Sequence, residues 1–143
     1  MFTLALVIFL ALDQLSKYLV DSSMELGQTI PLIKGLFDLT YVRNDGAAWN
    51  ILSGKQTLLI VVTGAVMLTI IAYVIVNRKK ISLLEKLSLG MIVGGGIGNL
   101  IGRASVGYVI DFLNIQIIPV FNVADIGVTV GCILLILTIL KSK

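Results

Sequence analysis

Two aspartates, Asp111 and Asp125, lie within residues 101–127, a stretch whose other residues are mostly apolar. Two carboxyl groups that lie close together cannot both ionise at low cost, so such a pair shares one proton and titrates in two separate steps. The charged member can then take a proton from water, and the neutral member can donate a proton to a carbonyl oxygen. If the fold brings them together, these two residues can hydrolyse a peptide bond with the chemistry that aspartic proteases use.

The composition is compatible with this chemistry and excludes several others. The chain has no histidine, which excludes histidine-based catalytic triads and the usual zinc sites, so we expect neither a metal nor another cofactor. Cys132 is the only cysteine, so the chain cannot form an internal disulfide. Ser16 and Lys17 could form a serine–lysine dyad, but adjacent helix positions point about 100° apart, which places them poorly for mutual activation.

The overall composition indicates an integral membrane protein. Of the 143 residues, 57% are hydrophobic and only 13% are charged, and the mean hydropathy is +1.04. Each of four apolar runs is long enough to cross ~30 Å of hydrocarbon as a helix of roughly 20 residues. The sequence therefore predicts an all-α membrane protein, in which residues 1–143 form a single domain built on a bundle of four transmembrane helices. The runs lie at about residues 1–20, 57–76, 83–103 and 121–140.

Basic residues predict how these helices are oriented. The loop NRKKISLLEK and the C-terminal KSK are rich in lysine and arginine, and such segments stay on the cytoplasmic side of a membrane. Both termini are then cytoplasmic, and residues 21–56 and 104–120 face the outside. The net charge of +3 is small and lies mostly in short loops, which indicates topology rather than nucleic-acid binding.

The first outer segment, residues 21–56, is predicted to contain secondary structure of its own. It contains β-branched and aromatic residues that are punctuated by glycine and proline, which predicts a small extracytoplasmic β-containing segment with one or two short strands. We also expect a turn near NDG and a short amphipathic helix through Trp49, whose indole suits the membrane interface. The second outer segment is predicted to be a connection that carries Asp111.

The polar residues of three helices are predicted to lie at one depth in the membrane. Because a helix rises ~1.5 Å per residue, each of them falls in the outer third of its span, and the inner half contains nothing comparable. Residues three or four apart share a helix face, so the polar groups of each helix point in one direction. A charge near the middle of a span costs ~2.5–3.5 kcal/mol, so several at one level imply a shared polar pocket that is open to the outside. The residues concerned are Asp13, Lys17, Asn99, Arg103, Asn122 and Asp125.

Several of these residues also have a purely structural interpretation. Asp13 and Lys17 could form only a structural ion pair, and Arg103 could extend to lipid headgroups. Asn99 could simply bond across helices. The glycine-rich run at residues 94–98 looks like a nucleotide-binding loop, but a surface for close helix packing explains it better.

The chain contains five segments that together resemble the bacterial lipoprotein signal peptidases, the signal peptidase II family: DQLSK, VRNDGAAW, GGGIGNLIGR, GYVIDF and FNVADIGVTVG. The resemblance covers nearly the whole chain, in the same order. It implies four membrane helices and an aspartyl dyad near the outer leaflet of the bacterial cytoplasmic membrane. The implied activity is cleavage of prolipoproteins on the N-terminal side of a diacylglyceryl-modified cysteine. The implied partners are lipid-modified prolipoprotein signal peptides and membrane lipids, not nucleic acid, and we expect a monomer.

By this resemblance the catalytic pair is Asp111 and Asp125. Other motif residues are expected to bind the substrate or to support the site. The family pattern usually has an aspartate before the arginine of its third motif, where this chain has Gly102, so Arg103 or a neighbouring polar group lacks that partner. The supporting residues are Asp13, Lys17, Asn44, Gly95, Asn99, Arg103, Asn122 and Ala124.

The implied substrate explains why several polar residues surround the aspartates. A signal peptide is itself a membrane helix, so its scissile stretch must unwind where the aspartates meet it. Asn99, Arg103 and Asn122 could then satisfy the backbone groups that unwinding frees. The segment around Asn44 and Trp49 could clamp the lipid and exclude water.

Two other classes of function are compatible with parts of the sequence. One is a small proton-coupled transporter or channel subunit that uses Asp125 as a relay. It would need polar groups through both halves of the membrane, and the inner half has none. The other is a structural membrane adaptor without chemistry, which would not explain why the polar residues share one depth.

Overall fold

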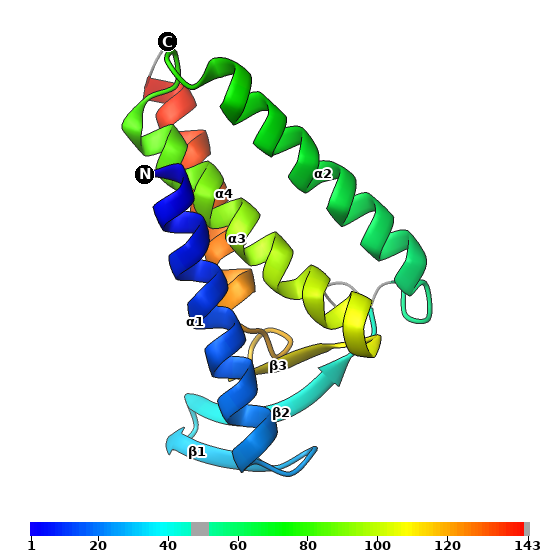
Figure 1. Cartoon of the computed structure of the whole chain (residues 1–143). Coiled ribbons are helices and arrows are strands. Elements are labelled where there is room, and N and C mark those ends of the chain that lie inside the picture. Colours follow the sequence, from blue (N-terminus) through cyan, green and yellow to red (C-terminus); the bar gives the residue numbers. More distant parts are fainter. Residues whose placement is uncertain (47–51, 142–143) are drawn as a thin grey trace.

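The computed structural model describes residues 1–46 and 52–141, and in that part of the chain four long helices stand above a small sheet (Figure 1). The helices are α1 (Phe2–Ser23), α2 (Gln56–Asn77), α3 (Leu83–Val106) and α4 (Val123–Lys141). Each is long and apolar enough to cross a membrane. Together with a three-stranded antiparallel sheet, they confirm the predicted fold class, a four-helix membrane bundle with a small β-containing segment.

The ends of α3 are set by local chemistry. Ser82 accepts a hydrogen bond from the backbone N–H of Glu85 at 3.2 Å, and the side chain of Glu85 accepts one from the N–H of Ser82 at 2.6 Å. This reciprocal capping box satisfies two backbone donors that a helix start leaves unpaired. At the other end Gly107 has a φ of 82°, a left-handed conformation that glycine adopts without strain, so the chain turns directly out of the helix.

The centre of the bundle is α3, which packs against the other three helices. Three consecutive glycines each face a different neighbour. A methyl group at Gly94 would lie 2.6 Å from a backbone oxygen of α1. At Gly95 it would collide with a backbone oxygen of α4, and at Gly96 with the sulfur of Met67 in α2. The glycine-rich run is therefore a surface for close helix packing, as the sequence predicts.

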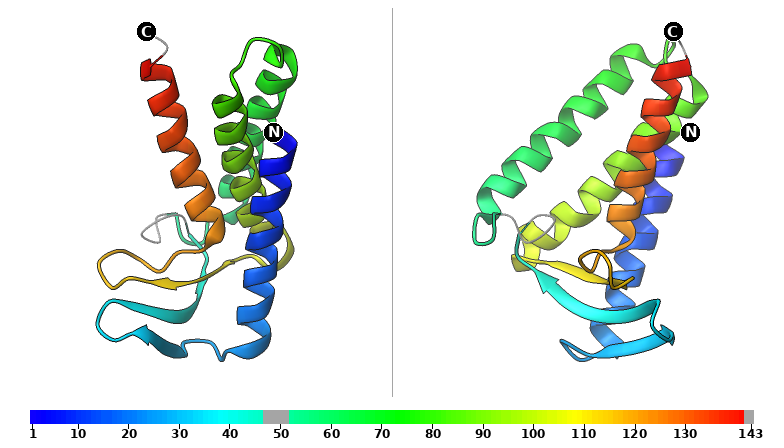
Figure 2. Two further views of the ribbon diagram at one scale, coloured as in Figure 1. Left: turned by 90° about the vertical axis from the view of Figure 1, so that its left-hand side faces the viewer. Right: turned by 180° about the vertical axis from the view of Figure 1, so that it is seen from behind.

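The sheet lies across one end of the bundle (Figures 1 and 2). Its strands are β1 (Thr29–Ile33), β2 (Phe37–Asn44) and β3 (Val109–Asn114), in the order β1-β2-β3 with both pairs antiparallel. β1 and β2 agree with the strands expected in the first outer segment. β3 was not predicted, because it is short and pairs with a strand that is distant in the chain, so residues 104–120 carry little local signal of their own.

The second helix, α2, diverges from the other helices toward the sheet (Figures 1 and 2). In its C-terminal half, Met67 and Val74 are buried in an apolar cluster that includes Val93 of α3. Nearer its N-terminus, from residue 56 to residue 66, no residue of α2 is buried. Toward the sheet end, a cavity separates α2 from α3.

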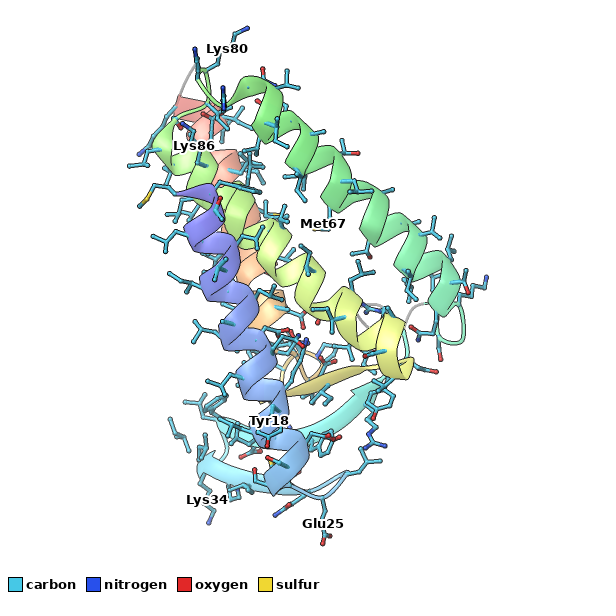
Figure 3. All side chains as sticks on the ribbon, in the orientation of Figure 1. Tyr18, Glu25, Lys34, Met67, Lys80 and Lys86 are labelled. Atoms are coloured by element: carbon cyan, nitrogen blue, oxygen red, sulfur yellow. The ribbon has the colours of Figure 1, made fainter. Side chains whose placement is uncertain are left out.

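Charged side chains mark the two ends of the molecule (Figure 3). Lys80 and Lys86 lie at the end that carries both termini, whereas Glu25 and Lys34 lie at the sheet end. Trp49, and the short helix predicted through it, lie outside the described residues.

Candidate active site

Asp125 lies in the first turn of α4, and Asn122 immediately precedes this helix. The backbone N–H of Asn122 donates to Oδ2 of Asp125 at 3.1 Å, and the backbone N–H of Asp125 donates to Oδ1 of Asn122 at 3.0 Å. This is the reciprocal pattern of a capping box, with Asn and Asp in place of Ser and Glu. The residues that start the helix therefore also fix the position of the Asp125 carboxyl group.

Asp111 lies on β3, not in a loop as the sequence predicts, and it is 3% exposed. Asn44, at the end of β2, donates from Nδ2 to Oδ2 of Asp111 at 3.0 Å, and Asn122 donates to Oδ1 at 2.7 Å. The pKa of Asp111 is raised to about 6, mainly because the group is buried. The amide donors and Lys17 oppose this rise in pKa, whereas the charge of Asp125 adds to it.

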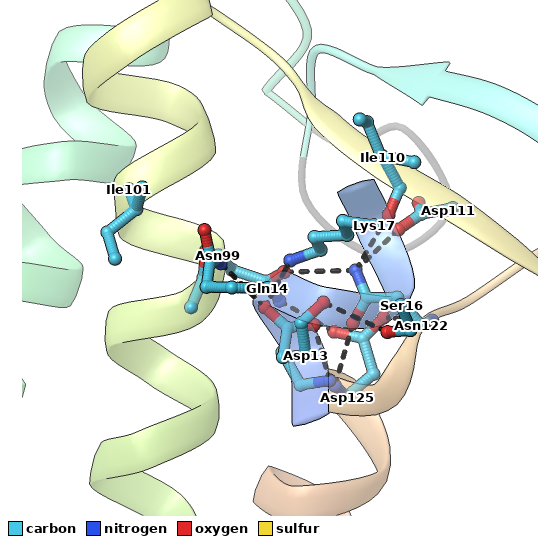
Figure 4. Close-up of polar contacts among 12 residues, drawn as sticks. Asp13, Gln14, Ser16, Lys17, Asn99, Ile101, Ile110, Asp111, Asn122 and Asp125 are labelled. Atoms are coloured by element: carbon cyan, nitrogen blue, oxygen red, sulfur yellow. Dashed lines mark hydrogen bonds and ion pairs between the residues drawn. The ribbon is translucent and has the colours of Figure 1, made fainter. Parts of the chain in front are cut away.

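Asn122 bridges the two carboxyl groups, donating to Asp111 from its side-chain Nδ2 and to Asp125 from its backbone N–H (Figure 4). Its Nδ2 also donates to Oδ1 of Asn99 at 3.0 Å, and Asn99 donates in turn to Oδ1 of Asp125 at 2.8 Å. In the described part of the chain, neither Asp111 nor Asp125 forms an ion pair with a lysine or arginine. Amide side chains therefore hold both carboxyl groups in one network.

Asp13 and Lys17 form a buried ion pair on α1, with 2.7 Å between Nζ and Oδ2. Nζ of Lys17 also donates to Oδ1 of Asn99 at 2.9 Å, and Oδ1 of Asp13 accepts the backbone N–H of Ala124 at 3.0 Å. One member thus orients Asn99, and the other holds the first turn of α4. Gly98 makes room for this pair, because a side chain there would collide with the Asp13 carboxylate.

Arg103 bends toward the chain that follows β2 instead of extending away from the bundle. One terminal nitrogen donates to the backbone oxygen of Gly46 at 2.9 Å, and its buried Nε has no hydrogen-bond partner among the described residues. A side chain at the preceding Gly102 would lie 2.7 Å from the backbone oxygen of Tyr108. This turn therefore leaves no room for an aspartate at that position, and Arg103 bonds to a carbonyl group instead.

Both aspartates line a cavity of about 960 Å³ that is bounded by α2, α3, α4 and the sheet, and Asn99 and Arg103 line it as well. Facing them is a mostly apolar wall from α2. The sequence does not reveal this wall, because α2 is apolar on all sides and no periodic pattern distinguishes the face that it turns to the cavity. The α2 residues that line the cavity are Val62, Thr63, Val66 and Met67.

A family model for signal peptidase (SPase) II matches residues 5–141 of the chain. The chain belongs to the signal peptidase II family. The lipoprotein signal peptidase of Halothermothrix orenii is 46% identical over 134 residues, which cover 94% of this chain and 91% of the relative. That of Moorella thermoacetica is 42% identical and covers 94% of this chain and 89% of its own length. That of Streptococcus pyogenes serotype M5 is 38% identical and covers 100% and 95%.

Two solved structures, both described as bacterial membrane enzymes, have the same fold as this signal peptidase II chain. One has a TM-score of 0.90 and 33% sequence identity, and the match covers 96% of this chain and 86% of that one. The other has a TM-score of 0.87 and 33% identity, with 98% and 92% covered. The resemblance stated from sequence motifs is thereby confirmed, as is the multi-pass membrane architecture.

The motif residues of this signal peptidase II chain come together where the bundle meets the sheet. Most of them belong to the hydrogen-bonded network around Asp111 and Asp125. Gly95 lets α3 lie against the backbone of Ala124, and Arg103 lines the cavity. Two carboxyl groups that are both bonded to Asn122 and line one cavity can exchange a proton with a molecule bound there.

Proposed function

We propose that the protein is a membrane aspartic endopeptidase that removes signal peptides from prolipoproteins, cutting on the N-terminal side of a diacylglyceryl-modified cysteine. Family membership supports the removal of signal peptides, since the curated relatives are named lipoprotein signal peptidases. One observation supports the aspartic type: the carboxyl groups of Asp111 and Asp125 accept hydrogen bonds from the side chain and the backbone of one residue, Asn122, and both aspartates line the same cavity. The family does not favour the alternative, a transporter or channel subunit with Asp125 as a relay.

The proposed reaction is general acid–base hydrolysis of a peptide bond. One carboxylate takes a proton from a water molecule while the water oxygen attacks the scissile carbonyl carbon. The other carboxyl group donates its proton to the carbonyl oxygen. The C–N bond then breaks: the leaving nitrogen takes the proton that the first carboxylate had accepted, and one hydroxyl group of the tetrahedral intermediate returns its proton to the second carboxylate. Asn44, Asn99 and Asn122 hold the carboxyl oxygens in place throughout, so little reorganisation accompanies the change in charge.

The two walls of the cavity suit the two parts of such a substrate. The apolar wall, which includes Val62 and Val66, can contact a signal-peptide helix or the diacylglyceryl chains. At the sheet end, Asn99 and Arg103 can bond to backbone groups that are freed when the helix unwinds. The unpartnered Nε of Arg103 is a donor available for this purpose among the described residues.

We further propose that the protein lies in the bacterial cytoplasmic membrane as a monomer, surrounded by membrane lipids, with both termini in the cytoplasm. Lys80, in the α2–α3 connection, and Lys86, near the start of α3, lie at the end that carries both termini. The aspartates then lie near the outer leaflet. Cysteine labelling in intact cells tests this topology: a membrane-impermeant reagent should modify Lys34→Cys but not Lys79→Cys, in a Cys132→Ser background.

The decisive experiment uses the purified protein in detergent with a synthetic prolipoprotein peptide that carries a diacylglyceryl cysteine. We expect cleavage of this peptide directly before the modified cysteine, and little cleavage of the same peptide without the lipid. Asp111→Asn and Asp125→Asn should lose cleavage. Asp38→Asn is the matched control, because Asp38 is a buried carboxyl group (8% exposed) of the same sheet that does not line the cavity. Cleavage by the two variants at the rate of this control would rule out the aspartic mechanism.

A further inference from the structure

Large aliphatic side chains are exposed at one end of the sheet, in two neighbouring turns. In register, Asp38 of β2 is the partner of Asn114, and its Oδ2 accepts a hydrogen bond from Gln116 at 2.9 Å, so the β1–β2 turn and the β3–α4 loop lie together. Both project to the same side of the bundle (Figure 2, left). We call the four exposed residues the sheet tip: Ile33 (54% exposed), Leu36 (61%), Ile117 (82%) and Ile118 (45%).

The depth of the sheet tip can be estimated from α1. Asp13 accepts the backbone N–H of Ala124, so it lies level with the first turn of α4. Beyond this level α1 continues to expose apolar and aromatic side chains, with Tyr18 at 69% and Leu19 at 54%. At ~1.5 Å per residue, the lipid-facing surface of α1 extends about 9 Å past the start of α4. Along the bundle axis, the lipid-facing surface therefore reaches beyond the first turn of α4.

The loop between β3 and α4 occupies the layer just beyond that first turn. Phe121, two residues before α4, is tied to β3 by a backbone hydrogen bond to Leu113 at 3.0 Å, so the loop stays close to the bundle. Ile118 also lines the active-site cavity. The loop therefore has one side on the cavity, while Ile117 is exposed at the depth where α1 still presents apolar residues.

The position of Lys34 also indicates that lipid surrounds the sheet tip. The β1–β2 turn has the sequence IKGLF at residues 33–37, so Lys34 stands between the exposed Ile33 and Leu36. A lysine beside exposed aliphatic residues suits a membrane interface, because the ammonium group can reach lipid phosphates while its neighbours enter the acyl region. In water the same four side chains would form an exposed apolar patch, which a folded protein normally covers.

We propose that the sheet tip inserts into the acyl-chain region of the leaflet on the sheet side, with Lys34 at the headgroups. Phospholipid, rather than water or another protein, then covers Ile33, Leu36 and Ile117. The insertion holds the β3–α4 loop against the membrane and places lipid directly beside the cavity. This inference concerns lipid contact alone and does not depend on the proposed cleavage.

The test measures the depth of nitroxide labels by electron paramagnetic resonance. Labels are attached to Ile117→Cys and Leu36→Cys in a Cys132→Ser background, and each protein is reconstituted into vesicles of phosphatidylethanolamine and phosphatidylglycerol. Both labels should collide with oxygen more often than with a water-soluble nickel chelate. The matched controls are Ile133→Cys on the exposed face of α4 (52% exposed) as the lipid reference, and Glu25→Cys beyond the end of α1 as the aqueous reference.

We expect the ratio of oxygen to nickel accessibility at both test sites to be several-fold above that at Glu25→Cys, and closer to that at Ile133→Cys. A ratio equal to that at Glu25→Cys would overturn the proposal, because it would place the sheet tip in water. Low accessibility to both reagents would overturn it equally, because it would indicate that protein, including a second copy of this chain, covers the tip. The two test sites lie on separate turns, so either decides the question if the other variant does not fold.

Discussion

The buried carboxyl group on α1 and those at the cavity are held in two different ways. Asp13 is fully buried and forms an ion pair with Lys17 at 2.7 Å. Asp111 and Asp125 are instead held by amide side chains and backbone N–H groups, and both line the cavity. An ammonium partner neutralises a carboxylate where it stands, whereas amide donors orient a carboxyl group without supplying a charge. The first arrangement suits a scaffold, and the second suits groups that must take up and release a proton.

The largest expected effect comes from removing the proton exchange. Asp111→Asn and Asp125→Asn keep the side-chain volume, so each should fold and bind a non-cleaved lipopeptide. Each should lower the cleavage rate on the order of 10³-fold or more, and the double variant should be little worse, because the pair acts as a unit. Single-turnover cleavage and lipopeptide binding are the measurements. A cleavage rate within tenfold of that of the unmodified protein, in either variant, would show that the carboxyl groups at the cavity are not needed for proton exchange.

The next effect concerns the ion pair on α1. Lys17→Met keeps the length of the side chain but leaves the Asp13 carboxylate buried without its cation, which should cost about 3–5 kcal/mol of stability. Unfolding in detergent should show this loss. The double variant Asp13→Asn with Lys17→Met should recover part of it, because no charge is then left unpaired. If Lys17→Met unfolds at the same temperature as the unmodified protein, the pair is not a stabilising element of the scaffold.

A smaller effect should appear in the pH dependence of stability. The pKa of Asp111 is raised from 3.8 to about 6 in the folded protein, so the folded state holds this proton more tightly than the unfolded state. The resulting stabilisation is fully present below pH ~4 and is lost as the pH rises through 6, by about 2–3 kcal/mol at most. Unfolding measured at pH 4 and pH 7 should show this loss in the unmodified protein. Asp111→Asn should show a shallower dependence, and an unchanged slope would contradict the assignment.

The smallest effect should come from one amide donor. The hydrogen bond from Asn44 lowers the pKa of Asp111, so Asn44→Ala should raise that pKa and shift the pH–rate profile toward higher pH. The loss of one bond of about 1 kcal/mol predicts a rate loss of roughly tenfold at most. Asn114→Ala is the control, because Asn114 donates to Thr40 in the same sheet and does not line the cavity. An equal shift in both variants would mean that the sheet as a whole, not Asn44, affects Asp111.

The parts of this structure that the sequence predicts are those specified by short-range patterns. Long apolar runs predict the four helices, and i,i+4 spacing predicts that Asp13 and Lys17 pair. Likewise, the three-residue spacing of Asn122 and Asp125 places them together at a helix start, although the capping exchange between them was not foreseen. The resemblance to the family also identified Asn44 as a site residue. No local sequence pattern indicates that it donates a hydrogen bond to Asp111.

The parts that the sequence does not predict depend on contacts between distant segments. Strand β3 exists because it pairs with β2, so the sequence around Asp111 looks like a connection when it is considered alone. The apolar wall of the cavity depends on the divergence of α2, which its uniformly apolar sequence does not encode in any visible period. The fit of Gly102 against the backbone of Tyr108 likewise depends on the turn between α3 and β3.

The three glycines in the middle of α3 constrain the number of residues in this helix more strongly than they constrain the residue types on its exposed face. Because Gly94, Gly95 and Gly96 face three different helices, inserting one residue before them would rotate the rest of α3 by about 100° and exchange all three partners at once. Asn99 and Arg103 would turn away from the cavity in the same step. We therefore expect relatives to vary in the residues that α3 exposes to lipid, but to conserve the number of residues between the Ser82 cap and Asn99.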